Sequence, residues 1–555
     1  MISNNIIPSH LQKYVVEQNY ARYTPVDQAV WRYCLRQLKK ILSVHGHSSY
    51  IDGLEKTGIN TEAIPKISDI SEKIQKFGWR ALPVSGFIPP AAFMELQSLS
   101  ILPVASDMRT MDHLLYTPAP DIVHEAAGHA PILVDPEYAD YLRQYSQVAK
   151  KSIISKEDLE IYEAIRELSD LKENPNSTPS EILLSEKKLK DISKSISHIS
   201  EASQLSRMNW WTAEYGLIGD IKNPKIFGAG LLSSVGEANW CLSDKVKKIP
   251  LTIDCIEQGY DITEPQPQLF VTPDFKTLVT VLNEFSETMA YKLGGHLGLD
   301  KAILAKSVTT AEFDSGFQIS GVIAEYILDK NNNIIFIKLN GPTQICKNET
   351  EILGHDKNYH QHGYSTPIGK YTASSEMVGT NVCFQYDSGF EINGLLSEKS
   401  NGIYRFENAT ATYQGKVYFE PAWGSFDIIT ATTVTSVFGG PADRIKYGET
   451  TDFVAKRIPD AVYTDKQKKL FEVFQDTRNL RQQKCSESEL QNLFNIAATN
   501  FKHEWLLFIE LIEISVKNNF SDILNSKIKA HLENIKSTNK NLTGVIDDGL
   551  KLIYE

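Results

Sequence analysis

The stretch DIVHEAAGHAP (residues 121–131) places two histidines and a glutamate within one short run of the chain. His124 and His129 stand five residues apart, whereas the zinc helix of a metallohydrolase reads H-E-x-x-H, with its histidines four residues apart. On a straight α-helix, four steps end about 40° from the starting face and five steps end about 140° from it. The two imidazoles can therefore share a ligand only if the helix departs from regular α geometry.

The residues around the two histidines allow such a departure. Asp121 follows Pro118 and Pro120, and this position predicts an N-cap, so that the histidines fall in the first turns of a helix. Gly128 and Pro131 leave that helix free to widen or to end. One π-type turn brings residues five apart nearly onto one face, and such turns concentrate at functional sites. We therefore predict a π-type turn here; the alternative is an ordinary helix end with one capping and one packed histidine.

A third ligand is needed, because two imidazoles alone make a poor site for most metals. Glu214 stands within NWWTAEYGL (209–217), where a carboxylate is costly to bury unless it is paired or coordinates a metal. Two histidines and one carboxylate on one face of an ion leave the opposite positions open, as in the facial triad of non-haem Fe(II) oxygenases. A zinc metallohydrolase with Glu125 as general base is the alternative. The five-residue spacing of the histidines argues against that alternative.

Composition limits the classes of partner and compartment. The 555 residues carry a formal charge of −12, and an acidic chain lacks the basic surface that nucleic acid requires. The six cysteines are scattered without a C-x-x-C pair, which indicates free thiols in a reducing compartment. The first residues do not read as a secretory signal, and no run of roughly eighteen apolar residues predicts a membrane span. We expect a cytoplasmic protein whose partners are small molecules.

Hydrophobic periodicity divides the chain into three parts. Residues 1–308 are mostly helical, as the apolar spacing in VDQAVWRYCLRQLKKIL (26–42) illustrates, and we expect a mostly α catalytic domain. Within it, residues 150–205 hold two charged helical segments around a proline-containing turn, which predicts an inserted, solvent-facing hairpin. Residues 309–458 predict an antiparallel β domain, and residues 459–555 predict a helical C-terminal segment.

The β domain contains a short internal echo. DSGFQISGVI (314–323) recurs as DSGFEINGLL (387–396), which indicates a duplicated β unit. We find no metal or nucleophile constellation in the sequence from residue 310 onward. We therefore expect these residues to serve assembly, including oligomerisation, or regulation or partner binding, and we expect a core ending near residue 308 to suffice for catalysis.

Five separated blocks of the sequence occur in the order found in a known family. On these blocks the chain resembles the pterin-dependent aromatic amino acid hydroxylases, over roughly residues 20–300 apart from the hairpin: YTPVDQAVWR (23–32), VSGFIPPAAFMELQ (84–97), YTPAPDIVHEAAGHAPILVDPEYADYL (116–142), WWTAEYGLIG (210–219) and FGAGLLSSVGEANWCL (227–242). The resemblance implies Fe(2+) and a tetrahydropterin as cofactors. It also implies O2 and an aromatic amino acid as substrates, with phenylalanine to tyrosine as the leading reaction and tryptophan hydroxylation as the alternative.

The resemblance also assigns roles to individual residues. It implies that His124, His129 and Glu214 bind iron and that Glu125, beside the first ligand, assists catalysis near the pterin and the iron. The pterin-binding segment corresponds to four further residues: Gly86, Phe87, Ile88 and the stacking aromatic Phe93. Phe93 could equally be an ordinary core phenylalanine.

Eight residues correspond to substrate contacts in the family. They are Arg109, Thr117, Pro120, Asp121, Trp210, Tyr215, Gly230 and Ser233. Arg109 falls where the family binds the substrate carboxylate, since a guanidinium matches a carboxylate with two parallel hydrogen bonds, and Asp121 could brace it. As an isolated residue, Arg109 would otherwise be read as a surface charge.

The sequence departs from the family in three places. Glu214 follows His129 by a longer gap than usual, because the hairpin is inserted between them. Asn209 stands where an aromatic residue often contacts the pterin, which leaves the cofactor preference open. The region after residue 310 has no counterpart in the family, so a binding protein with an inactive core is a third alternative. The complete set of ligand positions argues against it.

Overall fold

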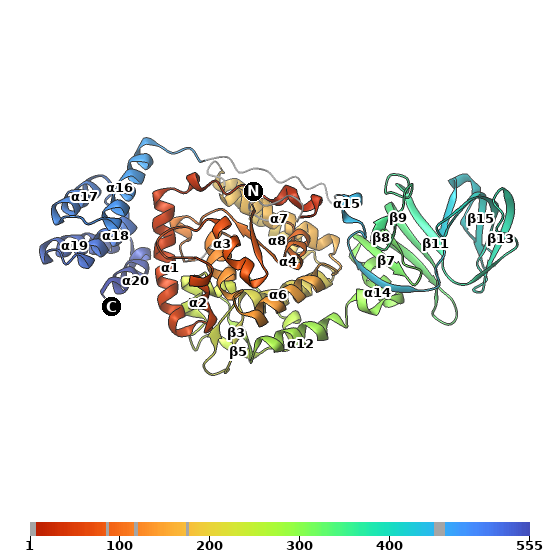
Figure 1. The fold of residues 1–555 in the computed structure, drawn as a ribbon, viewed down its shortest axis with the longest axis horizontal. Helices are drawn as coiled ribbons and strands as arrows, with labels where there is room; N and C mark the ends of the chain where they lie inside the picture. Colours follow the sequence, from red (N-terminus) through yellow and green to blue (C-terminus); the bar gives the residue numbers. More distant parts are fainter. Residues whose placement is uncertain are drawn as a thin grey trace.

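The structure, a computed structural model, describes residues 7–84, 88–115, 120–173, 177–262, 264–448 and 461–554. Figure 1 shows a helical body in the middle, two β sheets at one end of the long axis and a group of C-terminal helices at the other. This arrangement agrees with the predicted fold class of a mostly α part, an antiparallel β part and a helical end. In the described residues, no helix is both long enough and apolar enough to cross a membrane.

The helical body forms around α1 (Pro25–His45), the first long helix of the chain. Thr24 and Asp27 form a capping box at its start, and Pro25 occupies the first helical position, where a missing N–H costs nothing. The other helices of the body are α2 (Ser49–Lys56), α3 (Ile67–Ile74), α4 (Pro90–Ser98), α5 (Ala130–Ile132), α6 (Pro136–Ala149), α9 (Glu201–Asn209), α10 (Ala229–Leu232), α11 (Val235–Trp240), α12 (Phe275–Ser286), α13 (Ala290–Leu293) and α14 (Gly295–Ala305).

Two small sheets complete the body. β1 (Arg80–Val84) and β2 (Ile101–Ala105) pair in parallel. β4 (Lys225–Ile226), β3 (Leu217–Ile218), β6 (Gln268–Thr272) and β5 (Lys247–Pro250) form a second sheet in that order. The body is therefore predominantly helical, as predicted, with short strands that the periodicity of the sequence did not reveal.

The predicted hairpin is present as α7 (Lys156–Glu173) and α8 (Pro179–Lys194), which pack against each other. Thr178 and Glu181 form a capping box at the start of α8. Leu183 and Leu184 on α8 are 68% and 70% exposed, so this helix faces solvent, as expected for an insertion.

The β region consists of two antiparallel sheets. The first contains β7 (Val308–Phe313), β8 (Phe317–Leu328), β9 (Ile334–Lys347), β10 (Thr350–Glu351), β11 (Gly363–Pro367) and β18 (Val434–Gly439). The second contains β12 (Tyr371–Ala373), β13 (Thr380–Tyr386), β14 (Glu391–Ser400), β15 (Ile403–Tyr413), β16 (Lys416–Phe419) and β17 (Phe426–Ile429). Apolar side chains of α14 and the first sheet form one core, and the second sheet encloses another.

The two sheets share one strand order, which explains the internal echo. In the first sheet β18, β7, β8 and β9 pair in sequence, with β10 and β11 both on β9. In the second sheet β12, β13, β14 and β15 do the same, with β16 and β17 both on β15. The first copy of DSGF connects β7 to β8, and the second connects β13 to β14. Gly316 and Gly389 in these two turns have φ angles of 78° and 88°, which favour glycine. The pairing therefore agrees with the predicted duplication.

The C-terminal helices pack against α1 and lie at the opposite end of the molecule from the described strands of the β region that precedes them in the sequence (Figure 1). They are α16 (Asp465–Gln482), α17 (Glu487–Asn500), α18 (Trp505–Lys517), α19 (Asp522–Thr538) and α20 (Thr543–Tyr554). Tyr33 of α1 lies edge-on to Trp505, with ring centroids 5.3 Å apart, and its hydroxyl donates to the carbonyl of Val545. Their apolar side chains join those of the body in one continuous core.

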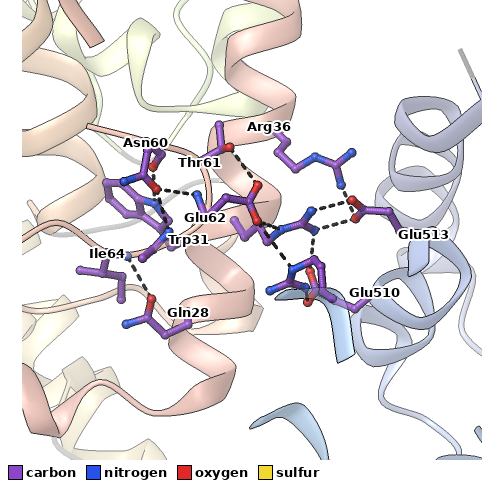
Figure 2. Close-up of polar contacts among 12 residues, drawn as sticks. Gln28, Trp31, Arg36, Asn60, Thr61, Glu62, Ile64, Glu510 and Glu513 are labelled. Atoms are coloured by element: carbon purple, nitrogen blue, oxygen red, sulfur yellow. Dashed lines mark hydrogen bonds and ion pairs between the residues drawn. The ribbon is translucent and has the colours of Figure 1, made fainter. Parts of the chain in front are cut away.

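A buried ionic network reinforces this contact (Figure 2). Arg32 of α1 is 4% exposed, and its Nη1 and Nη2 atoms donate to the two carboxylate oxygens of Glu513 at 2.6 Å each. Nη1 also donates to Glu510 at 2.9 Å. Arg36 pairs with Glu513, and Arg481 of α16 pairs with Glu510. Charges that would be costly to bury singly are thus matched across the interface.

The network and the shared core change what we expect of the first 308 residues. Removing the chain beyond residue 308 would leave Arg32 and Arg36 without Glu513 and would expose the apolar side chains that α18 and α20 cover. We therefore propose that the helical body depends on the C-terminal helices for stability, even though the candidate site described below lies entirely before residue 308.

Replacing Glu513 by Gln should destabilise the protein strongly. The amide keeps the shape of the side chain but removes the carboxylate that Arg32 and Arg36 share, which leaves Arg32 with Glu510 and Glu62 as charged partners. Breaking a buried pair costs up to about 3–5 kcal/mol. Thermal and urea unfolding of the full chain would measure the change. Glu533→Gln, at an exposed carboxylate of α19, should change stability by less than about 0.5 kcal/mol. Equal stability of the two variants would contradict the role given to this network.

The same pair predicts a dependence of stability on pH. Burial acts to raise the pKa of Glu513, but Arg32 outweighs burial and holds the pKa of this carboxyl below its ordinary value. Ionised Glu513 therefore stabilises the fold above about pH 4.3, the value for an unfolded chain, and this contribution is lost as the pH falls through the lower, folded-state pKa. The wild-type chain and the Gln variant should converge in stability in acid, whereas a gap that is independent of pH would contradict the assignment.

Candidate metal centre

His124 and His129 lie on a π-helix, η5 (Val123–His129), as the five-residue spacing predicts. The Asp121 carboxylate accepts a hydrogen bond from the His124 backbone N–H at 3.0 Å, so it caps the start of this helix. Gly128 is required where η5 meets α10, because a Cβ atom there would lie 2.6 Å from the carbonyl oxygen of Ala229. The widened turn is thus held in place by a close backbone approach.

Glu214 completes a triad with the two histidines. It ends a second π-helix, η6 (Trp210–Glu214), which the sequence did not predict. The Nε2 atoms of His124 and His129 are 3.2 Å apart, and each lies 3.3 Å from one carboxylate oxygen of Glu214. Burial acts to raise the pKa of Glu214, but the two imidazoles outweigh it and hold the pKa below its usual range. Three ligand atoms therefore converge on one point, around an ionised carboxylate.

Hydrogen bonds orient His124 toward this point. The Ser233 hydroxyl lies 2.7 Å from the carbonyl of Ala229 and 3.1 Å from His124 Nδ1. When this hydroxyl donates to Ala229, it accepts from Nδ1–H, and the lone pair of Nε2 is directed at Glu214 and His129. This arrangement is the one that a metal-binding histidine needs.

Glu125 lies beside the triad, on the same π-helix. It is 4% exposed, and its Oε2 atom has no hydrogen-bond partner among the described residues. Burial raises the pKa of Glu125 to about 8, and the charge of Glu214 adds to the effect while His129 opposes it. The carboxyl therefore holds its proton near neutral pH, and a cation bound to the triad would favour its release.

Arg109 is a buried residue and not a surface charge. Its Nε and Nη2 atoms donate to the two carboxylate oxygens of Asp121 at 2.8 and 2.7 Å, and Nη1 donates to the carbonyl of Ser233 at 3.2 Å. A guanidinium has five N–H donors, so two remain for a ligand. Burial acts to raise the pKa of Asp121, but Arg109 outweighs it and lowers the pKa, so the pair is ionised. The predicted brace between the two residues is present.

The aromatic residues after Asn209 form a stack. Trp210 stacks with Tyr215 at a centroid distance of 4.4 Å and with Tyr260 at 4.3 Å. Gly230 allows Tyr215 to approach, since a Cβ atom at this position would lie 2.8 Å from the tyrosine ring. Pro120 is half-buried just before the π-helix.

The predicted pterin segment is only partly described. Ile88 is buried, and Phe93 on α4 is half-buried, and both pack with Leu82 and Leu96 in a small cluster beside β1. Gly86 and Phe87, and the predicted substrate residue Thr117, lie outside the described residues.

Sequence reasoning missed two residues of this site. The amide of Asn209 donates to Glu214 at 3.4 Å, so the residue that departs from the family pattern contacts a member of the triad. Tyr260 joins the aromatic stack from a distant loop, and its sequence surroundings gave no signal. The five-residue spacing from Asn209 to Glu214 repeats that of the histidines and could have indicated the second π-helix.

Comparisons with known proteins cover the same part of the chain. The family model of the biopterin-dependent aromatic amino acid hydroxylases matches residues 10–162 and 180–296, and its gap falls in the α7–α8 hairpin. Phenylalanine-4-hydroxylase of Mesorhizobium japonicum is 30% identical over 269 residues, which are 48% of this chain and 81% of the relative. That of Pseudomonas aeruginosa is 28% identical over 288 residues, covering 51% of this chain and 93% of the relative.

A solved structure of Chromobacterium violaceum phenylalanine hydroxylase, with bound iron(III) and 7,8-dihydrobiopterin, is 25% identical. It aligns with a TM-score of 0.40 over 49% of this chain and 85% of its own. The residues that the family model matches include His124, His129 and Glu214. This chain belongs to the biopterin-dependent aromatic amino acid hydroxylases.

Proposed function

We propose that this chain hydroxylates L-phenylalanine to L-tyrosine, with O2 and a tetrahydropterin, at an Fe(II) ion held by His124, His129 and Glu214. The observation that carries the proposal is the triad itself, whose nitrogen and oxygen atoms lie 3.2 to 3.3 Å apart. Iron and the reduced pterin together supply the activation of O2. The relatives named phenylalanine-4-hydroxylase support phenylalanine as the substrate.

The donor set fits Fe(II) because two neutral imidazoles and one carboxylate leave positions open for other ligands. Ser233, when it donates to Ala229, keeps the lone pair of His124 Nε2 available to the ion. Glu125 supplies a catalytic carboxyl beside the ligands, because its buried Oε2 atom is free of partners among the described residues. Because the chain belongs to the hydroxylase family, we interpret the two histidines as iron ligands and not as the ligands of a zinc metallohydrolase.

Arg109 anchors the substrate carboxylate in this proposal. Asp121 holds the guanidinium through two hydrogen bonds and keeps the buried charge paired before the substrate arrives. The two N–H donors that remain match a carboxylate. Thr117 and Ser233 are assigned as further substrate contacts by their place in the family pattern. The pairing also fixes the distance between the carboxylate site and the triad, because Asp121 caps the helix that carries the histidines.

We place the aromatic ring of the substrate against a wall of apolar side chains near the triad. Pro120, Trp210, Tyr215 and Gly230 contribute that wall, and the stack of Trp210 with two tyrosines makes it rigid. Gly86, Phe87, Ile88 and Phe93 are assigned to the pterin by their place in the family pattern.

The direct test is turnover by the full chain after anaerobic loading with Fe(II), supplied with a tetrahydropterin, O2 and either phenylalanine or tryptophan. We expect tyrosine as the main product and slower turnover of tryptophan. Preferential hydroxylation of tryptophan would assign the chain to the alternative substrate. Absence of a hydroxylated product from both amino acids would contradict the proposal.

Replacing Glu214 by Ala should abolish tyrosine formation and greatly weaken iron retention. The triad has one protein anion, and its loss removes both a ligand and the charge that balances the ion. Iron content by elemental analysis, measured with turnover, checks this outcome. Glu137→Ala, at an exposed carboxylate of α6, should leave both unchanged. Wild-type iron content in the Glu214 variant would remove this residue from the site.

Replacing Arg109 by Lys should raise KM for phenylalanine by about tenfold or more, on the scale of one lost charge-assisted hydrogen bond. A lysine keeps the charge but lacks the planar fork, so it cannot pair with both Asp121 and a substrate carboxylate through two parallel hydrogen bonds each. Iron content should survive, and Arg143→Lys, at an exposed position of α6, should leave KM unchanged. If kcat and thermal stability fell while KM stayed constant, Arg109 would have a structural role only.

A further inference from the structure

Three metal-ligating side chains gather in the β region, far from the triad in sequence. His355 and His360 lie between β10 and β11, and Asp427 lies on β17. They are 8%, 8% and 5% exposed, and one ligand atom of each lies within 4.8 Å of the others. The expectation that residues after 310 lack a metal constellation is therefore wrong. It failed because the histidines and the aspartate are far apart in sequence.

The backbone holds the two histidines firmly against the first sheet. The carbonyl of His355 accepts from the N–H of Ile345 at 3.0 Å, and the carbonyl of His360 accepts from the N–H of Thr343 at 3.1 Å. Both donors belong to β9. Asp427 belongs to the second sheet, where β17 pairs with β15. The cluster thus lies where the two copies of the β unit meet.

The two imidazoles have the spacing of nitrogens that share an ion. His355 Nδ1 lies 3.1 Å from His360 Nε2, which is close to the 3.2 Å between the histidines of the triad. Two nitrogens bound to one tetrahedral zinc ion at its usual bond length would lie about 3.3 Å apart. A single hydrogen bond between the two rings gives a similar distance, so the spacing permits an ion without requiring one.

Asp427 supplies the anion and keeps room for a cation. Arg405 donates to both of its carboxylate oxygens, from Nε to Oδ1 at 2.8 Å and from Nη2 to Oδ2 at 3.4 Å, and its Nη1 atom pairs with Glu398 at 3.0 Å. The side chain of Tyr359 also hydrogen-bonds Asp427. The two carboxylates together exceed the single arginine by one negative charge. A carboxylate has about four acceptor positions, so these partners orient Asp427 and leave about one position for an ion.

We propose that His355, His360 and Asp427 bind one divalent transition-metal ion of the zinc type, which ties the two β sheets together. Two imidazoles and a carboxylate suit Zn²⁺, whereas Ca²⁺ and Mg²⁺ prefer sites built from oxygen ligands alone. Tyr364 borders the cluster, with its ring edge-on to His360. A water molecule can take the remaining position. The role is structural, because the ligands join elements of both sheets.

The test counts metal in the full, iron-loaded chain. After dialysis against metal-free buffer, the protein is titrated with zinc sulfate, and zinc and iron per chain are measured by elemental analysis. We expect one tightly held zinc ion beyond the iron. His360→Gln and Asp427→Asn should each weaken zinc binding by at least tenfold. His362→Gln, an exposed histidine two residues further along, should bind zinc like the wild type.

Thermal unfolding separates loss of the site from loss of the fold. Zinc should raise the unfolding temperature of the wild-type chain and of His362→Gln, but should not raise that of His360→Gln. Absence of zinc uptake by the wild-type chain would overturn the proposal. The short distance between His355 and His360 would then be explained by a hydrogen bond between the two imidazole rings. Zinc uptake that is unaffected by the His360 and Asp427 variants would also overturn it, because the zinc would then lie at the triad or on the surface.

Discussion

The close approach of η5 to α10 is the constraint on which the candidate site depends. At Gly128 the π-helix passes so near the carbonyl of Ala229 that no side chain fits between them. This contact places His124 beside Ser233, which hydrogen-bonds its Nδ1 atom, and it places both imidazoles opposite Glu214. A regular α-helix at the same position would direct the two histidines to faces about 140° apart. The chemistry of the site therefore rests on one local departure from regular helix geometry.

Buried ion pairs serve two different purposes in this chain. Between Arg109 and Asp121, the pair fixes a buried guanidinium close to the triad, where we propose that it binds the substrate carboxylate. Between Arg32 and Glu513, the pair joins α1 to α18, which lies near the other end of the sequence. Burying such charges is costly unless each finds a partner, so both pairs specify a particular arrangement as well as stabilising it. The C-terminal helices are in this sense part of the helical body, although the β region separates them in sequence.

Features with a local signal could be predicted from the sequence. The π-turn followed from the spacing of His124 and His129 and from Gly128, and the hairpin followed from its charged helices and prolines. The short repeat of DSGF indicated the duplicated sheets, whose strand order then agreed. The assignment of Glu214 as a ligand came from its apolar surroundings, and the structure places it between the two histidines. Apart from the repeat, which compares two stretches 73 residues apart, each of these inferences used residues within a few turns of one another.

Contacts between distant segments could not be predicted in this way. Nothing near Arg32 indicates that Glu510 and Glu513 will neutralise it, because the pairing depends on how α18 packs on α1. The cluster in the β region combines two histidines from one loop with an aspartate from a strand of the other sheet. Arg109 was identified by family pattern and not by physics, since only the fold shows that it is buried. Sequence periodicity predicts the helices and strands, but the ion pairs between distant segments depend on how those elements pack in the fold.

The most direct test of this account is the Fe(II) affinity of Gly128→Ala, compared with that of Gly236→Ala in the full chain. A Cβ atom at position 128 would meet a backbone oxygen at 2.6 Å, whereas at position 236 the nearest atom is 3.5 Å away, an ordinary contact. The account predicts that the first variant folds but loses at least about tenfold in iron affinity, because the histidines move relative to Glu214. The second variant should bind iron like the wild type. Wild-type iron affinity in Gly128→Ala would contradict the claim that the packed π-turn builds the site.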